Sequence, residues 1–95
     1  MREKATEAKL VHAVKAVGGI APKFTSPGWS GMPDRLVLLP GGRVAFVEVK
    51  APGEQPRPLQ LARHRLLRGL GFKVYVLDGV EQIQQILKEI GGDAR

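Results

Sequence analysis

The sequence predicts an α/β domain whose central mixed β-sheet carries helices on its faces. Short apolar runs of strand length alternate with segments of helical periodicity, and two of the runs are separated by a tight Pro-Gly-Gly turn. The expected order is helix, weak strand, hairpin, helix, strand, helix. A chain of 95 residues makes one expected domain, residues 1–95, with a core so modest that a partner subunit would help.

Residues 3–17 are expected to form the first helix, which Gly18-Gly19 would end. Its apolar residues recur at spacings of three and four: Leu10, Val11, Val14 and Val17. Glu7 lies on the same stripe, and a carboxylate facing a core needs a partner. The alternative is that Glu7 lies close enough to the helix start to interact with the helix dipole and to reach water.

A weak strand and a loop follow the first helix. Residues 20–24 are predicted to form a short edge strand, because Pro22 cannot donate a hydrogen bond to a sheet. Residues 25–32 are rich in glycine and proline and lead directly into Asp34, so this loop should border any site built there. Trp29, the only tryptophan, would either stack on an exposed base or cap the core.

Two apolar strands around residues 36–39 and 44–50 form a predicted hairpin. A three-residue loop at residues 40–42 would set Asp34 directly opposite Glu48, with Cβ atoms about 5 Å apart, whereas a two-residue loop would set them one position out of step. Because strand side chains alternate, Glu48 and Lys50 share a face. Two carboxylates and an amine therefore converge at one end of the sheet.

Carboxylates that face each other across strands repel, so this arrangement needs a compensating charge. A divalent cation would provide it, since two carboxylates, a backbone carbonyl and waters form the oxygen-only site that Mg²⁺ accepts. Lys50 would then orient a water or stabilise charge on a phosphate. In the alternative interpretation, Glu48 and Lys50 are a solvated same-face pair and Asp34 belongs to a turn.

The second half of the chain is predicted to contain a helix over residues 59–68, a strand over residues 72–77 and a last helix. The strand is apolar apart from Lys73 and is expected to be buried on both faces. The last helix has one apolar stripe formed by Ile83, Ile86, Leu87 and Ile90, and residues 91–95 are expected to fray. His12 and His64 have no second histidine or cysteine at ligand spacing, so both are interpreted as bystanders.

Composition favours a polyanionic partner. Fifteen Lys and Arg against nine Asp and Glu give a net charge of +6, which suits nucleic acid, although other soluble proteins are equally basic. The absence of cysteine excludes disulfides, thiolate zinc sites and a cysteine nucleophile. No run of transmembrane length and no signal peptide is present, so an intracellular protein without a membrane partner is expected.

The segment Gly31-Met32-Pro33-Asp34-Arg35, the hairpin, Glu48-Val49-Lys50 and Gln60 together resemble the motif series of the VRR-NUC nucleases, within the PD-(D/E)XK superfamily. The similarity runs from Glu7 to about Leu77 and is to the stand-alone viral or bacterial type, which implies a bacterial or phage-infected cytoplasm. The resemblance implies the restriction-endonuclease-like fold.

It also implies roles for single residues. Asp34 and Glu48 would bind Mg²⁺ or Mn²⁺ together with the Val49 carbonyl, and Glu7, or else Glu3, would complete the acidic cluster. Lys50 would assist the attacking water, and Gln60 would position that lysine or a water, unless it is a surface glutamine. The expected DNA contacts are Lys23, Arg35, Arg63 and Trp29, although Lys23 and Arg63 could instead be solvated.

The sequence thus predicts a metal-dependent endonuclease that hydrolyses DNA phosphodiesters. By similarity to stand-alone members, we expect a homodimer acting on branched DNA such as four-way junctions, in replication, repair or recombination. The alternative is a basic DNA-binding module that does not cut, in which the acidic residues are structural. The two hypotheses differ in whether binding survives Asp34→Ala without a divalent ion.

Overall fold

The computed structural model describes residues 2–91, and its strands form one three-stranded mixed sheet of order β1-β2-β3. Strands β1 (Arg35–Leu39) and β2 (Arg43–Val49) pair antiparallel as the predicted hairpin. Strand β3 (Lys73–Leu77) lies parallel to β2. A parallel neighbour needs a crossover connection, and α2 (Pro58–Gly69) forms it.

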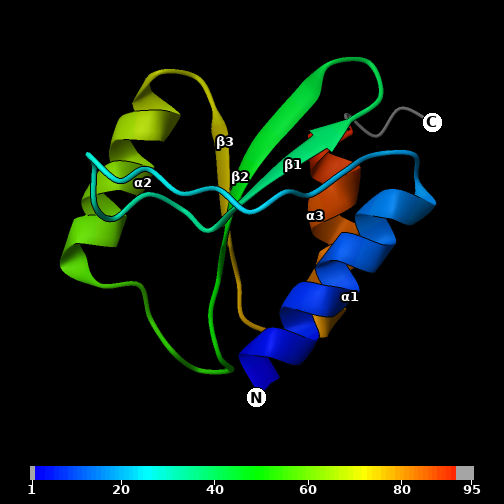
Figure 1. The fold of residues 1–95 in the computed structure, drawn as a ribbon, viewed down its shortest axis with the longest axis horizontal. Coiled ribbons are helices and arrows are strands. Elements are labelled where there is room, and N and C mark those ends of the chain that lie inside the picture. The colour runs from blue at the N-terminus through cyan, green and yellow to red at the C-terminus, as the bar shows by residue number, and fades with distance from the viewer. Residues whose placement is uncertain (1, 92–95) are drawn as a thin grey trace.

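Helices cover both faces of the sheet. Helix α1 (Arg2–Ala16) and helix α3 (Ile83–Ile90) follow the order that the sequence predicts, and a short 3₁₀ helix, η1 (Val80–Gln82), which the sequence did not predict, precedes α3. Figure 1 shows α1 and α3 on one side of the sheet and α2 on the other. No helix within residues 2–91 has the length and apolar character needed to cross a membrane.

The main core lies between the sheet and the pair α1 and α3. It is built from the strand residues that point toward these helices, every second position along each strand, and from the apolar stripes of the two helices. The residues are Leu10, Val14, Val37, Ala45, Val47, Val49, Leu77, Ile83, Ile86, Leu87 and Ile90. Burying a side chain of this kind contributes about 1.5–3 kcal/mol. Because Ala45, Val47 and Val49 of β2 point into this core, Glu48 must point to the opposite face of the sheet.

The opposite face of the sheet meets α2 and contains an aromatic row. Phe46 packs edge-to-face against both Phe24 and Phe72, with ring centroids 5.8 Å apart in each pair. Helix α2 covers this face with the buried side chains of Gln60, His64 and Leu67. Two of the three are polar, which is unusual for a packing face and marks the place where chemistry is to be sought.

The edge segment that the sequence predicts over residues 20–24 pairs with β1 only irregularly. Two isolated antiparallel bridges join Ile20 to Leu38 and Lys23 to Arg35. Pro22 takes part as an acceptor, since its carbonyl receives the Leu36 N–H at 3.1 Å. The missing N–H of proline explains why no continuous ladder forms.

Two further expectations are corrected. Helix α1 ends at Ala16, one residue earlier than predicted, and Val17 is 51 % exposed instead of continuing the apolar stripe. Strand β3 lies at an edge of the sheet, so Lys73 is exposed and Tyr75 only half-buried, and the strand is not buried on both faces. The expectation that residues 91–95 fray concerns, apart from Gly91, residues that lie outside the described ones.

Candidate active site

Asp34 and Glu48 meet at the end of the hairpin remote from its loop. Arg35 pairs with Val47 and Leu39 with Arg43, so the loop has three residues, and the next position along sets Asp34 opposite Glu48. The Asp34 carbonyl accepts the Phe24 N–H at 2.7 Å, and its Oδ2 accepts the Val49 N–H at 2.9 Å. The edge segment and β2 thus hold this aspartate from both sides.

Helix α2 holds Glu48 from the other direction. Gln60 Nε2 donates to Glu48 Oε2 at 3.0 Å, and His64 Nε2 lies 3.4 Å from Glu48 Oε1. Gln60 and His64 are four positions apart, so they lie on the same face of the helix, about one turn from each other. Glu48 and His64 are each only 1 % exposed. Both oxygens of a fully buried carboxylate are consequently in contact with α2.

The first turn of α2 fixes the amide of Gln60. Its Oε1 accepts the Arg57 backbone N–H at 2.8 Å, which satisfies an otherwise free donor at the helix start. The amide is therefore oriented with Nε2 toward Glu48. The sequence interpretation expected Gln60 to position Lys50 or a water, whereas in the structure its hydrogen-bond partner is Glu48.

The electrostatics of the pair are unfavourable without a cation. Burial raises the pKa of Glu48 to about 8, with the Asp34 charge and a hydrogen bond to Asp34 adding to the effect, while Lys50 and Arg57 oppose it. The pKa of His64 is lowered by burial and then by the charges of Arg68 and Lys50, with Asp34 opposing. Without a cation, Glu48 thus keeps its proton up to about pH 8 beside the Asp34 carboxylate, and a neutral imidazole lies next to it.

These residues fit a magnesium-type site with few protein ligands. Within residues 2–91, no three His, Asp or Glu side chains gather closely enough to form a metal-binding group. Mg²⁺ is commonly held by one or two carboxylates, with waters and substrate phosphate completing the octahedron. Asp34 and Glu48 would provide the two carboxylates, and a cation would offset both the burial of Glu48 and its repulsion by Asp34, the causes that raise the pKa of Glu48.

Glu7 does not join the two carboxylates, contrary to the expected acidic cluster. It forms an ion pair with Arg35, with Nε to Oε2 at 2.9 Å, and Arg35 Nη1 also donates to the Ala21 carbonyl at 2.6 Å. The reason is strand alternation. Arg35 pairs with Val47 on the α1 side of the sheet, whereas Asp34 and Glu48 belong to the α2 side. Glu3, the competing candidate, is also outside any three-residue acidic or histidine group.

The loop before Asp34 is attached to α2. Arg63 lies over the Trp29 ring, 4.2 Å from its centroid, and its Nε donates to the Ser30 carbonyl at 2.8 Å. Gly31 has φ of +88°, and a Cβ there would lie 2.8 Å from Leu59 Cγ. Only glycine allows the loop to approach the helix this closely. Trp29 is 46 % exposed on this support, and Lys23 is exposed where the loop begins.

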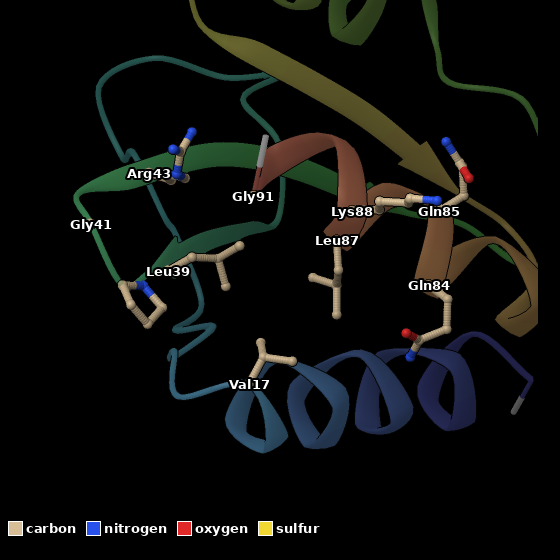
Figure 2. A pocket seen from close by; sticks show the side chains of 10 residues that line it. Val17, Leu39, Gly41, Arg43, Gln84, Gln85, Leu87, Lys88 and Gly91 are labelled. Atoms are coloured by element: carbon tan, nitrogen blue, oxygen red, sulfur yellow. The ribbon is translucent and has the colours of Figure 1, made fainter. Parts of the chain in front are cut away.

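A sizeable hollow in the described chain lies elsewhere. It has a volume of about 930 Å³ and opens between the hairpin loop, the end of α1 and α3. Figure 2 shows Val17, Leu39 and Leu87 around it, with Arg43 at its rim. No carboxylate lines it, and it is at the opposite end of the hairpin from Glu48. Its size therefore does not make it the site of chemistry.

His64 lies beside the carboxylate pair, a position that the sequence does not predict for it. The sequence pattern predicts a bystander, but α2 buries His64 against Glu48. The available signal was its spacing of four from Gln60, which places both residues on one helical face. That face could not be assigned to the sheet side from the local pattern alone, because Arg63 and Arg65 flank the histidine.

Comparison with known proteins places these residues in a family. The family model of the VRR-NUC domain matches residues 3–81. A protein named "Putative nuclease p44" from Acyrthosiphon pisum secondary endosymbiont phage 1 is 51% identical over 90 residues, which cover 95% of this chain and 96% of that protein. A solved structure of a VRR_NUC domain superposes with a TM-score of 0.87 at 34% identity, over 93% of this chain and 96% of that one.

Both the sequence and the fold therefore agree with one family over almost all of the chain. The structural match confirms the restriction-endonuclease-like α/β fold. The matched range contains Asp34, Glu48, Lys50, Gln60 and His64. The chain belongs to the VRR-NUC family of nuclease domains.

Proposed function

We propose that the protein is a divalent-metal-dependent endonuclease that hydrolyses DNA phosphodiesters. The observation that supports this most is the pair formed by the half-buried Asp34 and the fully buried Glu48, each held by a hydrogen-bond donor. Burial and the neighbouring Asp34 charge raise the pKa of Glu48 to about 8, so the ionised pair is unfavourable without a cation. A carboxylate pair of this kind would be costly in a protein that only binds a polyanion. It is useful where a cation must be held.

Asp34, Glu48 and the Val49 carbonyl would hold Mg²⁺ or Mn²⁺. The cation would supply an activated water nucleophile and neutralise charge on the scissile phosphate. Hydrolysis adds the water oxygen to phosphorus, breaks one P–O bond and leaves a phosphate monoester on one end and a hydroxyl on the other. The role of the two side chains is to keep fixed positions throughout, because catalysis of phosphoryl transfer is mostly positioning and electrostatics.

Lys50 follows β2 and shares the Glu48 side of the strand. Its charge influences both Glu48 and His64. From this place it would orient the attacking water and stabilise negative charge on the phosphate. Gln60 would act through Glu48, and Glu7 would act through Arg35 by holding the residue next to Asp34 in place.

Branched DNA is the proposed substrate. The net charge of +6 suits the DNA backbone, and Lys23 and Arg63 flank the loop that leads to Asp34. Trp29 offers an exposed indole on that loop, where an unpaired base at a junction could stack. Arg35 is occupied by Glu7 and Ala21, so its contribution to DNA binding would be smaller than that of Arg63.

We further propose a homodimer, as a four-way junction has two equivalent strands to cut. An apolar row crosses the end of the sheet that is nearest the hairpin loop, on the α2 side. It comprises Ile20, Val44 and Phe72, which are 57%, 38% and 45% exposed. Exposed apolar patches of this kind are typical of interfaces. Light scattering of the unmodified protein and of the double variant Val44→Ser/Phe72→Ser tests the dimer. We expect the unmodified protein to be a dimer and the double variant to be a monomer. A monomeric unmodified protein would refute the proposal.

The activity test uses labelled four-way junction, flap, duplex and single-stranded DNA with Mg²⁺, Mn²⁺ or EDTA. We expect cleavage that needs the metal, is fastest on a branched substrate and is lost in Asp34→Asn and Lys50→Ala. Glu54→Gln, an exposed carboxylate in the loop after β2, serves as the matched control and should cleave normally.

The alternative, a DNA-binding module that does not cut, predicts a different pattern. Binding would then be independent of divalent ions and would survive Asp34→Ala, with no cleavage of any substrate. Metal-independent binding alone would not distinguish the hypotheses, because phosphate contacts act without the cation. The absence of cleavage under every metal, in a protein whose fold is intact, would favour the alternative.

A further inference from the structure

His64 is positioned to orient Glu48. Its Nε2 lies 3.4 Å from Glu48 Oε1, while Gln60 Nε2 occupies the other oxygen at 3.0 Å. In the ionised form that would bind a cation, the Glu48 carboxylate only accepts hydrogen bonds, so the imidazole must then carry its proton on Nε2 to bond there. The 3.4 Å separation is at the long end for such a bond, and a small rotation of either side chain would shorten it.

The other imidazole nitrogen supports a specific role. Among the buried side-chain nitrogen and oxygen atoms of the described residues, His64 Nδ1 is the one that has no hydrogen-bond partner. A buried polar atom without a partner costs free energy, and an apolar side chain of similar shape would fill this space without that cost. Simple packing therefore does not account for a histidine at this position, whereas the contact of Nε2 with Glu48 does.

We propose that His64 is a positioning residue which, together with Gln60, fixes the carboxylate of Glu48 in the orientation that binds the divalent cation. The inference rests on the proposed function. The Gln60 amide and the neutral His64 imidazole carry no charge, so they orient Glu48 without neutralising it. Glu7, by contrast, is paired with the charged guanidinium of Arg35. With its rotation restricted from the helix side, the carboxylate is expected to bind metal with less loss of side-chain entropy.

The test measures Mn²⁺ binding to the metal-free protein by calorimetry, without DNA, and the thermal unfolding midpoint in EDTA. His64→Phe removes the donor and keeps a planar ring, and His64→Gln restores a donor. His12→Phe is the matched control, since His12 is the other histidine and is exposed on α1. If His64→Phe does not fold, the smaller His64→Leu carries the same comparison. Asp34→Asn reports on the metal site itself.

We expect His64→Phe to weaken Mn²⁺ binding about 10- to 100-fold, the range for residues that orient a metal ligand. His64→Gln should recover most of the affinity, and the unfolding midpoint of His64→Phe should equal or exceed that of the unmodified protein. In cleavage assays the half-saturating Mn²⁺ concentration should rise by the same factor, with kcat largely recovered at saturating metal.

The outcomes separate this inference from the proposed function. If Asp34→Asn abolishes Mn²⁺ binding while His64→Phe binds within twofold of the unmodified protein, the metal site stands and the role of His64 is wrong. A lower unfolding midpoint with unchanged metal affinity likewise indicates a structural histidine. If the unmodified protein binds no Mn²⁺, the metal site is refuted and the inference with it.

Discussion

The metal-free protein should lose stability as the pH rises from 6.5 to 8. Glu48 has a pKa of about 8 in the folded chain against a usual value of 4.5. Between these values the folded state holds a proton that the unfolded state has released, so stability falls with increasing pH. Of the charged groups facing Glu48, Asp34 raises this pKa, and Lys50 and Arg57 lower it.

The window begins at pH 6.5 because His64 acts in the opposite direction below it. Its pKa is lowered in the folded chain, so at lower pH the unfolded state binds the extra proton and acidification destabilises the fold. Tyr75 has a pKa raised above 10.0, through burial and then the Glu89 charge, and titrates beyond the upper limit. Within the window, Glu48 is the group with a resolved shift that changes its charge.

The magnitude follows from the pKa. One proton contributes about 1.4 kcal/mol per pH unit, and Glu48 is about half ionised at pH 8, so the free energy of unfolding should fall by about 1.5–2 kcal/mol across the window. For a domain of this size that corresponds to a decrease in Tm of about 6–12 °C. Addition of Mg²⁺ or Mn²⁺ should remove the dependence, because a bound cation stabilises the ionised form.

Urea unfolding followed by circular dichroism in EDTA, at intervals between pH 6.5 and 8, measures this directly. Glu48→Gln is the control, since it keeps the shape and cannot ionise, and its profile should be flat. A flat profile in the unmodified protein would refute the argument that the buried carboxylate is unbalanced. A slope of the same size in Glu48→Gln would assign the effect to another group.

Three further predictions concern the surroundings of the site. Glu7→Gln breaks the ion pair with Arg35 and should lower the free energy of unfolding by about 1 kcal/mol in urea melts, while Mn²⁺ affinity changes less than threefold. A loss of Mn²⁺ affinity as large as that of Asp34→Asn would instead indicate that Glu7 is a metal ligand. Gly31→Ala should cost about 1–3 kcal/mol, because φ is +88° and the new Cβ meets Leu59, while Gly28→Ala, which meets no neighbour, should be nearly neutral in the same melts. Trp29→Ala should weaken binding of DNA with unpaired bases by about 1–3 kcal/mol in anisotropy titrations, with fully paired duplex much less affected; equal losses on both would contradict base stacking.

The hairpin is the part of the fold that the sequence determined best. Loop length and strand alternation are local properties, and together they place Asp34 opposite Glu48 and assign Glu48 to one face. The apolar stripes of the first and last helices likewise predict most of the buried core. These patterns succeed because each depends on residues within a few positions of one another.

The partners of charged side chains could not be predicted in the same way. Glu7 and Arg35 are 28 residues apart, and their ion pair depends on which face of the sheet α1 covers. The contact of His64 with Glu48 depends on the rotation of α2 about its own axis, which is set by packing in three dimensions. The apolar stripe of α1 differs clearly from its polar positions, whereas the buried side of α2 is itself largely polar, so the spacing of apolar residues does not show which side of α2 faces the sheet.

Helix α2 connects the two halves of the site. Gln60 and His64 on one face contact the carboxylate that would hold the metal, and Arg63, on a neighbouring face, contacts the loop that carries Trp29. A movement of this helix would displace both the proposed metal ligand and the loop that carries Trp29. Substitutions confined to one face act on only one of them. His64→Phe and Arg63→Ala should therefore have additive effects on metal and DNA binding if α2 stays fixed, and coupled effects if DNA binding repositions the helix.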